Sequence, residues 1–121
     1  MREPVTPVPF GTGDRPTTVD VEALAATLRD EVDGEARFDA GSRGAYSTDG
    51  SNYRQVPLGV VVPRSVDDGA RAVRACTRFG APVLSRGGGT SLAGQTTNAA
   101  VVVDWAKYCD ALWRRACCAA R

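Results

Sequence analysis

The sequence predicts an α/β fold, because short apolar runs flank a stretch with clear helical signals. Residues 66–79 begin behind Ser65, a good N-cap, and carry two aspartates in the first turn. Gly80 can then close this helix in the left-handed conformation. The apolar runs are too continuous to leave one face in water, which is typical of buried strands; they are residues 58–62, 81–85 and 99–104. Strand, helix and strand in succession form a βαβ unit, and three such strands imply a parallel or mixed sheet.

Length, composition and charge exclude several classes of protein. The 121 residues suit one domain, and 43% hydrophobic with 24% charged residues is the composition of a globular chain. The sequence lacks the roughly 20 consecutive apolar residues of a membrane-spanning helix. A net charge of +1 gives no field that would recruit nucleic acid or an anionic membrane. Histidine is absent, which excludes a His-dependent nucleophile, a His-ligated zinc and an imidazole base within this chain.

The four cysteines indicate reduced thiols and no metal site. No C-x-x-C pair occurs, and adjacent residues such as Cys117 and Cys118 seldom ligate one ion. Met1 is followed by Arg2 and not by an apolar signal sequence. We therefore expect a cytoplasmic protein without a metal centre.

Before the first strand, the sequence predicts a leader, a helix and a loop. Residues 1–18 are rich in proline and glycine, which favours a disordered leader. Residues 19–32 are predicted to be helical, with Gly34 as the stop and an apolar stripe of Val21, Leu24, Leu28 and Val32. Residues 35–56 are rich in glycine and serine and predict an ordered loop, or a short strand at most. Tyr46 and Tyr53 are expected to anchor this loop on the core.

The crossover helix and the end of the chain each carry an unusual feature. Gly69 lies inside the helix, where glycine costs about 1 kcal/mol relative to alanine. The apolar face of this helix is expected to consist of Val66, Ala70, Val73 and Thr77. Residues 109–121 have no cap and no closing strand, so we interpret them as an atypical tail where the domain is truncated.

A glycine-rich stretch at the end of the second strand is the one place with the pattern of a ligand site. Three consecutive glycines, residues 87–89, let backbone N–H groups converge and let the main chain approach a phosphate closely. Ligands of open α/β sheets bind at the carboxyl ends of the strands, which is where this stretch begins. Arg86, Thr90 and Ser91 add a cation and two hydroxyl donors, although Arg86 can equally be a structural partner. The alternative is a glycine-rich turn that only connects two strands.

Two common phosphate motifs do not fit this stretch. Residues 89–96 are close to a P-loop, but Gln95 occupies the position of the lysine, and a strand follows where a P-loop begins a helix. The dinucleotide fingerprint G-x-G-x-x-G fails in either register, because Leu92 or Ser91 stands where glycine is required. An NTPase and a Rossmann NAD site are therefore disfavoured.

The residues do resemble the FAD-binding (PCMH-type) domain of the vanillyl-alcohol oxidase and p-cresol methylhydroxylase superfamily. The branch is that of FAD-linked D-lactate dehydrogenases and glycolate oxidase D-type subunits. The resemblance covers roughly residues 36–108, and the loop is its most specific part. The matching pieces are Tyr46–Asp49, Pro57–Ser65, Arg86–Gln95, and Val101–Asp104 with Lys107 after it.

This resemblance implies a cofactor and a set of binding residues. In the family, FAD lies between two α+β subdomains, and residues 19–108 resemble the amino-terminal part of such a domain. The implied cofactor-binding residues are Arg86, Gly87, Gly88, Gly89, Thr90, Ser91, Gly94 and Gln95. Some relatives carry histidine after the glycines and attach it to the flavin; Thr90 stands there in this chain, which implies noncovalent FAD. The sequence offers no credible catalytic residue.

The implied function is the FAD-binding portion of a flavin-dependent oxidoreductase that oxidises a small 2-hydroxy acid of the D-lactate or glycolate type. The chain is expected to be an inactive amino-terminal fragment when alone. Two alternatives stay open: another FAD-linked oxidase or synthase of the superfamily, and a non-enzymatic remnant of the fold. No nucleic-acid partner and no membrane span are expected.

Overall fold

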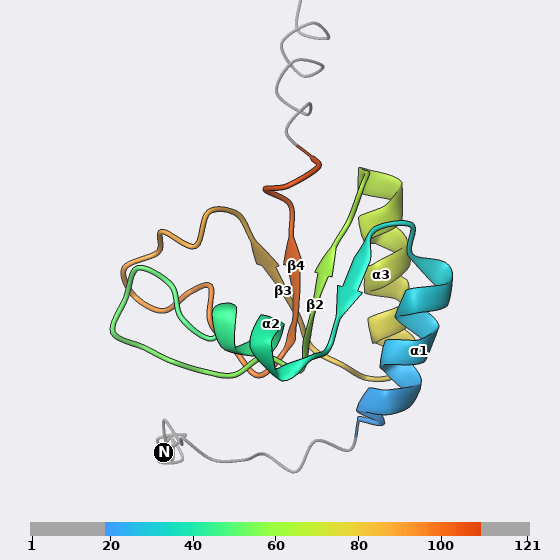
Figure 1. Cartoon of the computed structure of the whole chain (residues 1–121), viewed down its shortest axis with the longest axis horizontal. Helices are drawn as coiled ribbons and strands as arrows, with labels where there is room; N and C mark the ends of the chain where they lie inside the picture. Colours follow the sequence, from blue (N-terminus) through green and yellow to red (C-terminus); the bar gives the residue numbers. More distant parts are fainter. Residues whose placement is uncertain (1–18, 110–121) are drawn as a thin grey trace, which may run out of the picture.

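The computed structural model describes residues 19–109, which form a mixed four-stranded sheet flanked by helices (Figure 1). The elements in chain order are α1 (Val21–Glu31), β1 (Glu35–Arg37), α2 (Ala40–Ala45), β2 (Gly59–Val62), α3 (Val66–Arg78), β3 (Val83–Arg86) and β4 (Val101–Asp104). The predicted α/β class is confirmed. The predicted leader, residues 1–18, and the tail from residue 110 onward lie outside the described residues.

The strands lie in the order β1-β2-β4-β3, so the last strand of the chain is inserted between the two strands of the βαβ unit. β2, β4 and β3 run parallel, whereas β1 pairs with β2 in the antiparallel direction. In register, Val102 faces Val60 on one side and Leu84 on the other. The sheet is therefore mixed, which is one of the two kinds that the sequence predicted; the strand order was not predicted.

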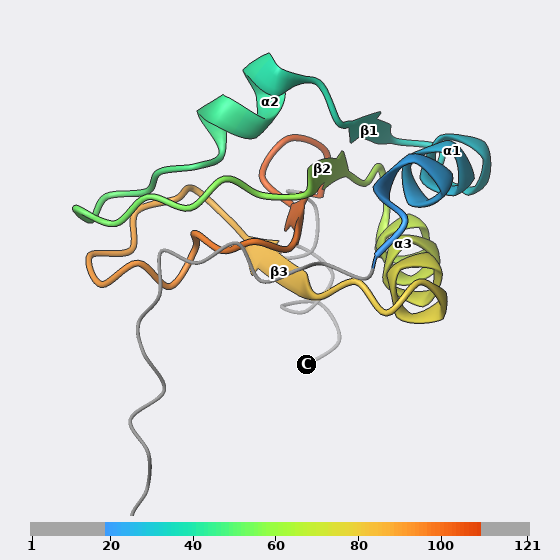
Figure 2. The ribbon, with the colours of Figure 1, turned by 90° about the horizontal axis from the view of Figure 1, so that it is seen from below.

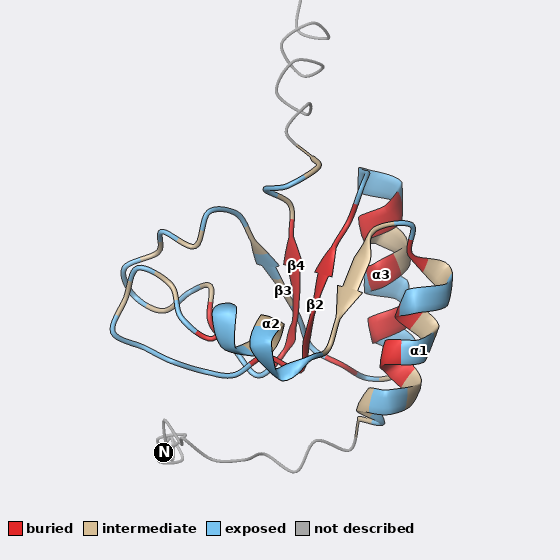
Figure 3. Cartoon of the chain, in the orientation of Figure 1, coloured by how far each residue is buried: buried red, intermediate tan, exposed pale blue. Residues whose placement is uncertain are grey.

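Burial follows position in the sheet. β2 and β4 are buried along their whole length, as predicted (Figure 3). The prediction of a buried strand over residues 81–85 is wrong, because β3 alternates between exposed and half-buried residues and Val83 is exposed. β3 is an edge strand that pairs with β4 alone, and sequence hydrophobicity does not reveal which strand lies at an edge.

Each face of the sheet carries its own apolar cluster. Val61 points to the face covered by α1 and α3, while Val60 and Val62 point to the opposite face, as the period of a strand requires. Figure 2 shows α1 and α3 packed together on one side of the sheet and α2 away from them. The larger cluster, under α1 and α3, contains Leu24, Leu28, Val32, Leu58, Val61, Ala72, Ala75, Cys76, Ala81 and Val101.

The helix predicted over residues 19–32 is confirmed as α1, but the prediction that Gly34 closes it is wrong. Asp20 caps α1 by accepting a hydrogen bond from the N–H of Ala23 at 3.0 Å, and Val32 ends the helix in an extended conformation. Gly34 does not adopt the predicted left-handed conformation. A Cβ on Gly34 would lie 2.1 Å from the carbonyl oxygen of Val62, so this glycine is required by the close approach of the chain to β2.

The third helix begins and ends as predicted but buries the opposite face. Ser65 caps α3 by accepting from the N–H of Asp68, and Gly80 follows the helix with a φ of 66°. The predicted apolar face is wrong, since Val66 and Val73 are exposed. The buried side instead carries small residues, which let α3 lie close to its neighbours; it consists of Asp68, Gly69, Ala72, Ala75 and Cys76.

The buried carboxylate of Asp68 connects two turns of the chain. Its oxygens accept hydrogen bonds from the backbone N–H groups of Asp33 at 2.8 Å, Gly34 at 2.9 Å and Arg64 at 3.0 Å. Arg71, one turn further along α3, lies 3.3 Å from the same carboxylate. The aspartate therefore joins the α1–β1 turn to the start of α3, which the capping signal in the sequence did not indicate.

A short helix in the predicted loop was missed. Residues 35–56 contain not only β1 but also α2, whose N-cap Asp39 accepts from the N–H of Ser42 at 2.8 Å. Its sequence, Ala-Gly-Ser-Arg-Gly-Ala, has no apolar period and low helix propensity. The support of α2 therefore comes from its cap and from the hydrogen bond that Arg43 Nε donates to the carbonyl of Pro57 at 2.8 Å, and not from helix propensity.

Candidate functional site

The glycine loop, residues 87–98, leaves the carboxyl end of β3 and returns to the start of β4 as a series of turns and bends. A second loop, residues 46–56, lies beside it, and we call it the companion loop (Figures 1 and 2). The two loops are directly joined, because the N–H of Gly50 donates to the carbonyl of Gly89 at 2.9 Å. The companion loop is itself closed by a bridge between Thr48 and Arg54.

Free backbone donors line the first half of the glycine loop. From Gly87 to Leu92, no backbone N–H donates a hydrogen bond to any residue in the described part of the chain. Backbone N–H groups are strong donors that need a partner, in water or in a ligand. Consecutive donors without side chains beyond Cα form the kind of concave surface that binds oxyanions.

Two of the glycines are not required by the packing of the chain itself. A Cβ on Gly87 would have no atom within 4 Å, and one on Gly88 would meet only the Thr90 methyl carbon at 3.7 Å, which is ordinary contact. Neither residue has a positive φ. The absence of side chains at these positions therefore leaves room for something that approaches from outside the described residues.

The other two glycines of the predicted site serve the loop's own conformation. Gly89 has a φ of 67°, and a Cβ there would lie 2.4 Å from the guanidinium of Arg86. Gly94 has a φ of 76° and lies under the ring of Tyr53. A Cβ on Gly94 would lie 2.8 Å from this ring. Tyr53 is 60% exposed, so the prediction that it anchors the loop on the core is wrong; it covers Gly94.

The predicted polar residues of the loop have different surroundings. Thr90 is exposed and Ser91 is half-buried, and neither hydroxyl forms a hydrogen bond with residues 19–109. Gln95 is folded back on the loop, where its Oε1 accepts from the N–H of Ala93 at 3.1 Å. The structure thus brings Thr90 and Ser91 to the same rim as the free N–H groups, and it places Gln95 against its own backbone.

Arg86 points under the loop and not along its rim. Its Nη1 donates to the carbonyls of Thr96 at 3.2 Å and Tyr46 at 3.4 Å, and its Nη2 donates to the carbonyl of Thr48 at 2.9 Å. The guanidinium also lies over the Tyr46 ring, 5.1 Å from its centre. Within residues 19–109 it has no carboxylate partner, so its positive charge stays beneath the glycine loop.

Asp49 is a second link between the loops, which the sequence pattern did not predict. Its Oδ2 accepts from the hydroxyl of Thr96 at 2.9 Å, and its Oδ1 accepts from the N–H and the hydroxyl of Ser51. These hydrogen bonds lower the pKa of Asp49 to about 2, and the one from the Ser51 hydroxyl has the largest effect. Its position in the resemblance, within Tyr46–Asp49, was the only signal that this residue matters to the site.

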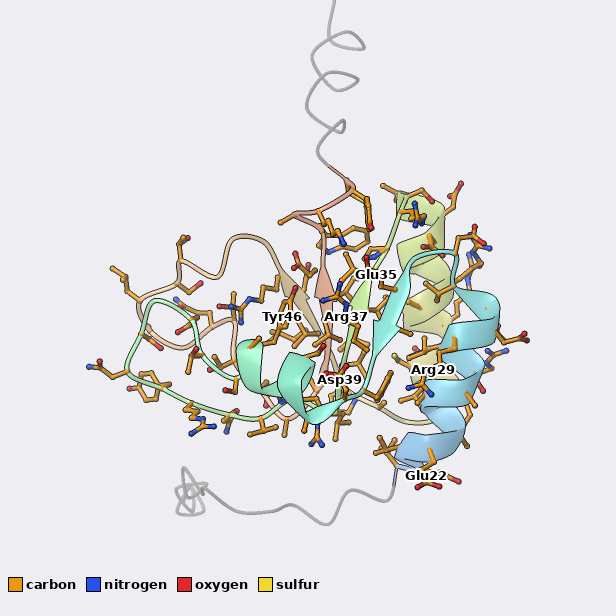
Figure 4. All side chains as sticks on the ribbon, in the orientation of Figure 1. Glu22, Arg29, Glu35, Arg37, Asp39 and Tyr46 are labelled. Atoms are coloured by element: carbon orange, nitrogen blue, oxygen red, sulfur yellow. The ribbon has the colours of Figure 1, made fainter. Side chains whose placement is uncertain are left out.

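Tyr46 connects the companion loop to the sheet, as predicted. Figure 4 shows its side chain beside the strands, where its hydroxyl donates to the buried Asp104 carboxylate at 2.5 Å. Its ring packs against Val60, Val62 and Val102. Burial, together with the Asp104 hydrogen bond, raises the pKa of Tyr46 to about 12.

The free groups of this site suit the binding of an anion. The N–H groups and hydroxyls on the rim can donate hydrogen bonds, and the nearby Asp49 and Asp104 carboxylates are already engaged in hydrogen bonds. Residues 19–109 contain no group of three or more side chains suited to a metal ion. The Cys76 thiol is buried, which raises its pKa to about 11 and makes it a poor nucleophile.

Comparison with known proteins agrees with this geometry. Residues 57–115 match the family described as FAD binding domain. The chain is 35% identical over 69 residues to glycolate oxidase subunit GlcD of Bacillus subtilis (strain 168), matching 54% of this chain and 15% of that protein. It is 32% identical over 93 residues to D-2-hydroxyglutarate dehydrogenase of Pseudomonas putida, matching 72% of this chain and 9% of that protein. The chain therefore spans less than a sixth of the length of these relatives.

Among solved structures, the fold is similar to BBE-like 1 of Physcomitrella patens. The D396N variant of that protein matches with a TM-score of 0.54 and 24% identity, over 67% of this chain and 18% of that chain. The wild-type protein matches with a TM-score of 0.53. At this identity the likeness concerns the fold alone, and it agrees with part of a PCMH-type domain. Residues 57–115 thus match the FAD binding domain family, which agrees with the resemblance found in the sequence.

Proposed function

We propose that this chain is the FAD-binding portion of a flavin-dependent oxidoreductase that oxidises a small 2-hydroxy acid of the D-lactate or glycolate type. The observation that supports it most is the row of free N–H groups from Gly87 to Leu92, with open space over Gly87 and Gly88. The two relatives are named for glycolate and for D-2-hydroxyglutarate, both of which are 2-hydroxy acids.

The residues of the glycine loop fit the diphosphate of FAD. A diphosphate carries oxygen acceptors, and the rim offers free backbone N–H donors with two hydroxyls that can also donate. The proposed contacts are the backbone of Gly87, Gly88, Gly89 and Thr90 and the hydroxyl of Ser91, with Gly94 and Gln95 completing the loop. When bound, FAD supplies the redox chemistry, and the protein supplies binding and orientation. The Arg86 charge beneath the loop adds to the positive potential at the donors.

The cofactor is held without a covalent bond in this proposal. Thr90 occupies the position at which some relatives carry the linking histidine, and the sequence contains no histidine. We assign no catalytic residue to the chain. The partners are FAD and, for the complete enzyme, the 2-hydroxy acid.

The proposed location is the cytoplasm. Cys76 is a free thiol inside the core, which suits a reducing compartment. Between residues 19 and 109, no helix combines the length and the apolar character needed to cross a bilayer.

Titration of the ¹⁵N-labelled chain with FAD tests the proposal directly. We expect the amide signals of residues 87–92 to shift most, since these N–H groups gain the diphosphate as acceptor. Gly88→Val should abolish the shifts while the circular dichroism spectrum stays close to native, because the ligand-free loop has room for the side chain. Gly44→Ala is the matched control, since a Cβ at that position also meets nothing within 4 Å but lies in α2.

Two results would contradict the assignment. If FAD moved no amide signal in the glycine loop, the chain would be better described as a fold remnant without cofactor. If Gly88→Val bound FAD as the original chain does, the diphosphate would have to lie elsewhere.

A further inference from the structure

We infer that Arg86 is a positioning residue, which fixes the glycine loop against the companion loop and does not itself contact the diphosphate. This inference rests on the proposed function, which assigns the diphosphate to the N–H groups of the same loop. It also makes the companion loop part of the cofactor site, as the support that sets the direction of those N–H groups.

The hydrogen bonds of the guanidinium carry this inference. Arg86 stands at the end of β3, directly before the loop, and its side chain turns back to three carbonyl oxygens. Two of these carbonyls, those of Tyr46 and Thr48, belong to the companion loop, and the third, that of Thr96, belongs to the far end of the glycine loop. The planar guanidinium of Arg86 thus joins the beginning of the glycine loop to its far end and to the companion loop.

The glycine above the guanidinium shows how closely the loop is shaped around it. Gly89 has a φ of 67°, which favours glycine, and the Arg86 Nη2 atom lies 2.4 Å from where its Cβ would be. At the same residue, the carbonyl accepts from the N–H of Gly50. The carbonyl of Gly89 therefore points to the companion loop, and the N–H of Thr90, which belongs to the same trans peptide, points to the opposite side of the backbone.

The companion loop is in turn attached to the sheet and to the loop's far end. Tyr46 lies between the Arg86 guanidinium and the Asp104 carboxylate at the end of β4. Asp49 accepts from the hydroxyl of Thr96, next to the carbonyl that Arg86 uses. A lysine cannot reproduce this arrangement, because its ammonium is a point charge without the planar fork of arginine.

The variant Arg86→Lys keeps the positive charge but loses the planar fork of hydrogen-bond donors. It therefore separates the positioning role of Arg86 from the effect of its charge. In the ligand-free ¹⁵N-labelled chain, we expect the backbone order parameters of residues 87–92 to fall from about 0.8 to below about 0.6. Titration with FAD should show roughly tenfold to hundredfold weaker binding, the size of effect that misplaced contacts produce. The salt dependence of binding should stay unchanged, because the charge is retained. Arg86→Gln should weaken binding further, since it removes the charge as well.

Arg74 supplies the matched controls. Its side chain is exposed on α3 and forms no hydrogen bond, ion pair or ring contact with residues 19–109. Arg74→Lys and Arg74→Gln should leave the order parameters of residues 87–92 and the affinity for FAD unchanged. The melting temperature of each variant shows whether a loss of FAD binding reflects general unfolding.

The outcomes distinguish this inference from the proposed function. If Arg86→Lys binds FAD within about twofold of the original chain, the residue acts through its charge, and the positioning role is overturned. If Arg86→Lys binds FAD weakly while the order parameters of residues 87–92 stay unchanged, the guanidinium contacts the ligand directly, which also overturns it. If the original chain does not respond to FAD, the proposed function fails. The order parameters of the ligand-free variants then still decide whether Arg86 holds the loop.

Discussion

Glycines serve different purposes in this chain, and only their contacts distinguish them. Gly87 and Gly88 face open space, which suits the approach of a ligand. Gly89 and Gly94 have positive φ angles that the loop itself needs. Gly69 lies under the ring of Trp105, with the position of a Cβ 2.1 Å from the ring. The sequence predicted that Gly87 and Gly88 let a phosphate approach. For Gly69 it predicted only a cost in helix propensity.

At the residue scale, Gly69→Ala is expected to destabilise the chain, although alanine is the better helix former. The gain in helix propensity is about 1 kcal/mol, and forcing a methyl group into a packed contact costs about 1–3 kcal/mol. The Trp105 ring would have to shift, and its N–H would lose the hydrogen bond to the Ser85 hydroxyl at 2.8 Å. We expect a net loss of about 1 kcal/mol in the free energy of unfolding, measured by denaturant titration, with a change in tryptophan emission.

Gly44→Ala is the control for that prediction. It also lies inside a helix, but a Cβ there meets no atom within 4 Å, so the variant should be more stable than the original chain by up to about 1 kcal/mol. Equal stabilisation by both alanines would show that the Trp105 contact has no energetic weight.

Elements in this fold are joined by single buried or shared polar groups. Asp68 ties the start of α3 to the α1–β1 turn, and Arg86 with Asp49 ties the two loops together. Among residues 19–109, no buried side-chain nitrogen or oxygen atom lacks a hydrogen-bond partner. Loss of one such group therefore leaves its backbone partners unsatisfied at a junction between elements.

At this scale, Asp68→Asn should cost about 2–4 kcal/mol of the free energy of unfolding. The amide nitrogen of asparagine would face backbone N–H groups that now donate to the carboxylate, and buried donors without acceptors are costly. Asp67→Asn is the matched control in the same helical turn, and it should cost less than about 1 kcal/mol because this residue is exposed. Urea unfolding of both variants measures the difference in the free energy of unfolding. A similar loss in each variant would mean that Asp68 stabilises the chain only through its charge at the start of the helix.

The contact between the loops should weaken in acid. Hydrogen bonds from Ser51 and Thr96 lower the pKa of Asp49 from 3.8 to about 2, so the folded chain favours its ionised form. This stabilisation is present above the unfolded value near 3.8 and is lost as the pH falls through about 2. Lys107 and Tyr108 lower the pKa of Glu35 from 4.5 to about 2, which adds a second loss in the same direction.

Stability measured between pH 5 and pH 2 checks this prediction. Asp49→Asn should show a shallower decline than the original chain, because the contribution of the Asp49 carboxylate is absent. Identical pH profiles would mean that Asp49 does not stabilise the loop contact.

The whole molecule presents one helix-covered face, a second face with a smaller apolar cluster, and an exposed edge at β3. The resemblance places FAD between two subdomains, of which this chain resembles the first. Because the chain spans 15% or less of the length of its curated relatives, we expect the affinity of the chain by itself to come from the glycine loop.

We expect the 121-residue chain to bind FAD more weakly than roughly micromolar and to show no turnover. Each loss of about 1.4 kcal/mol in contacts lowers affinity tenfold. Flavin fluorescence quenching measures the affinity, and dye reduction with D-lactate and glycolate measures activity. Stoichiometric tight binding with substrate-dependent dye reduction would show instead that the chain is a complete minimal enzyme.

Flavin bound to the complete protein should be released intact by acid. The chain has no histidine, and Thr90 stands at the position of the covalent link in some relatives. After precipitation with trichloroacetic acid, the yellow colour is expected in the supernatant. Flavin that remains with the pellet would indicate a covalent attachment and contradict this prediction.

The sequence by itself determined the features that depend on neighbouring residues. Continuous apolar runs identified β2 and β4 as buried strands, and the cap at Ser65 with Gly80 set the bounds of α3. The density of glycines after β3 predicted a loop with free backbone N–H groups, because backbone freedom follows from local composition.

Only the tertiary structure decided what depends on residues far apart in the chain. The insertion of β4 between β2 and β3 made β3 an exposed edge, and the packing of small residues chose the buried face of α3. Arg86 was predicted on the binding rim, but its side chain was drawn under the loop by carbonyls about 40 residues earlier in the sequence. The physical reason is that edges, buried faces and hydrogen-bond partners are properties of the assembled surfaces, which no local pattern contains.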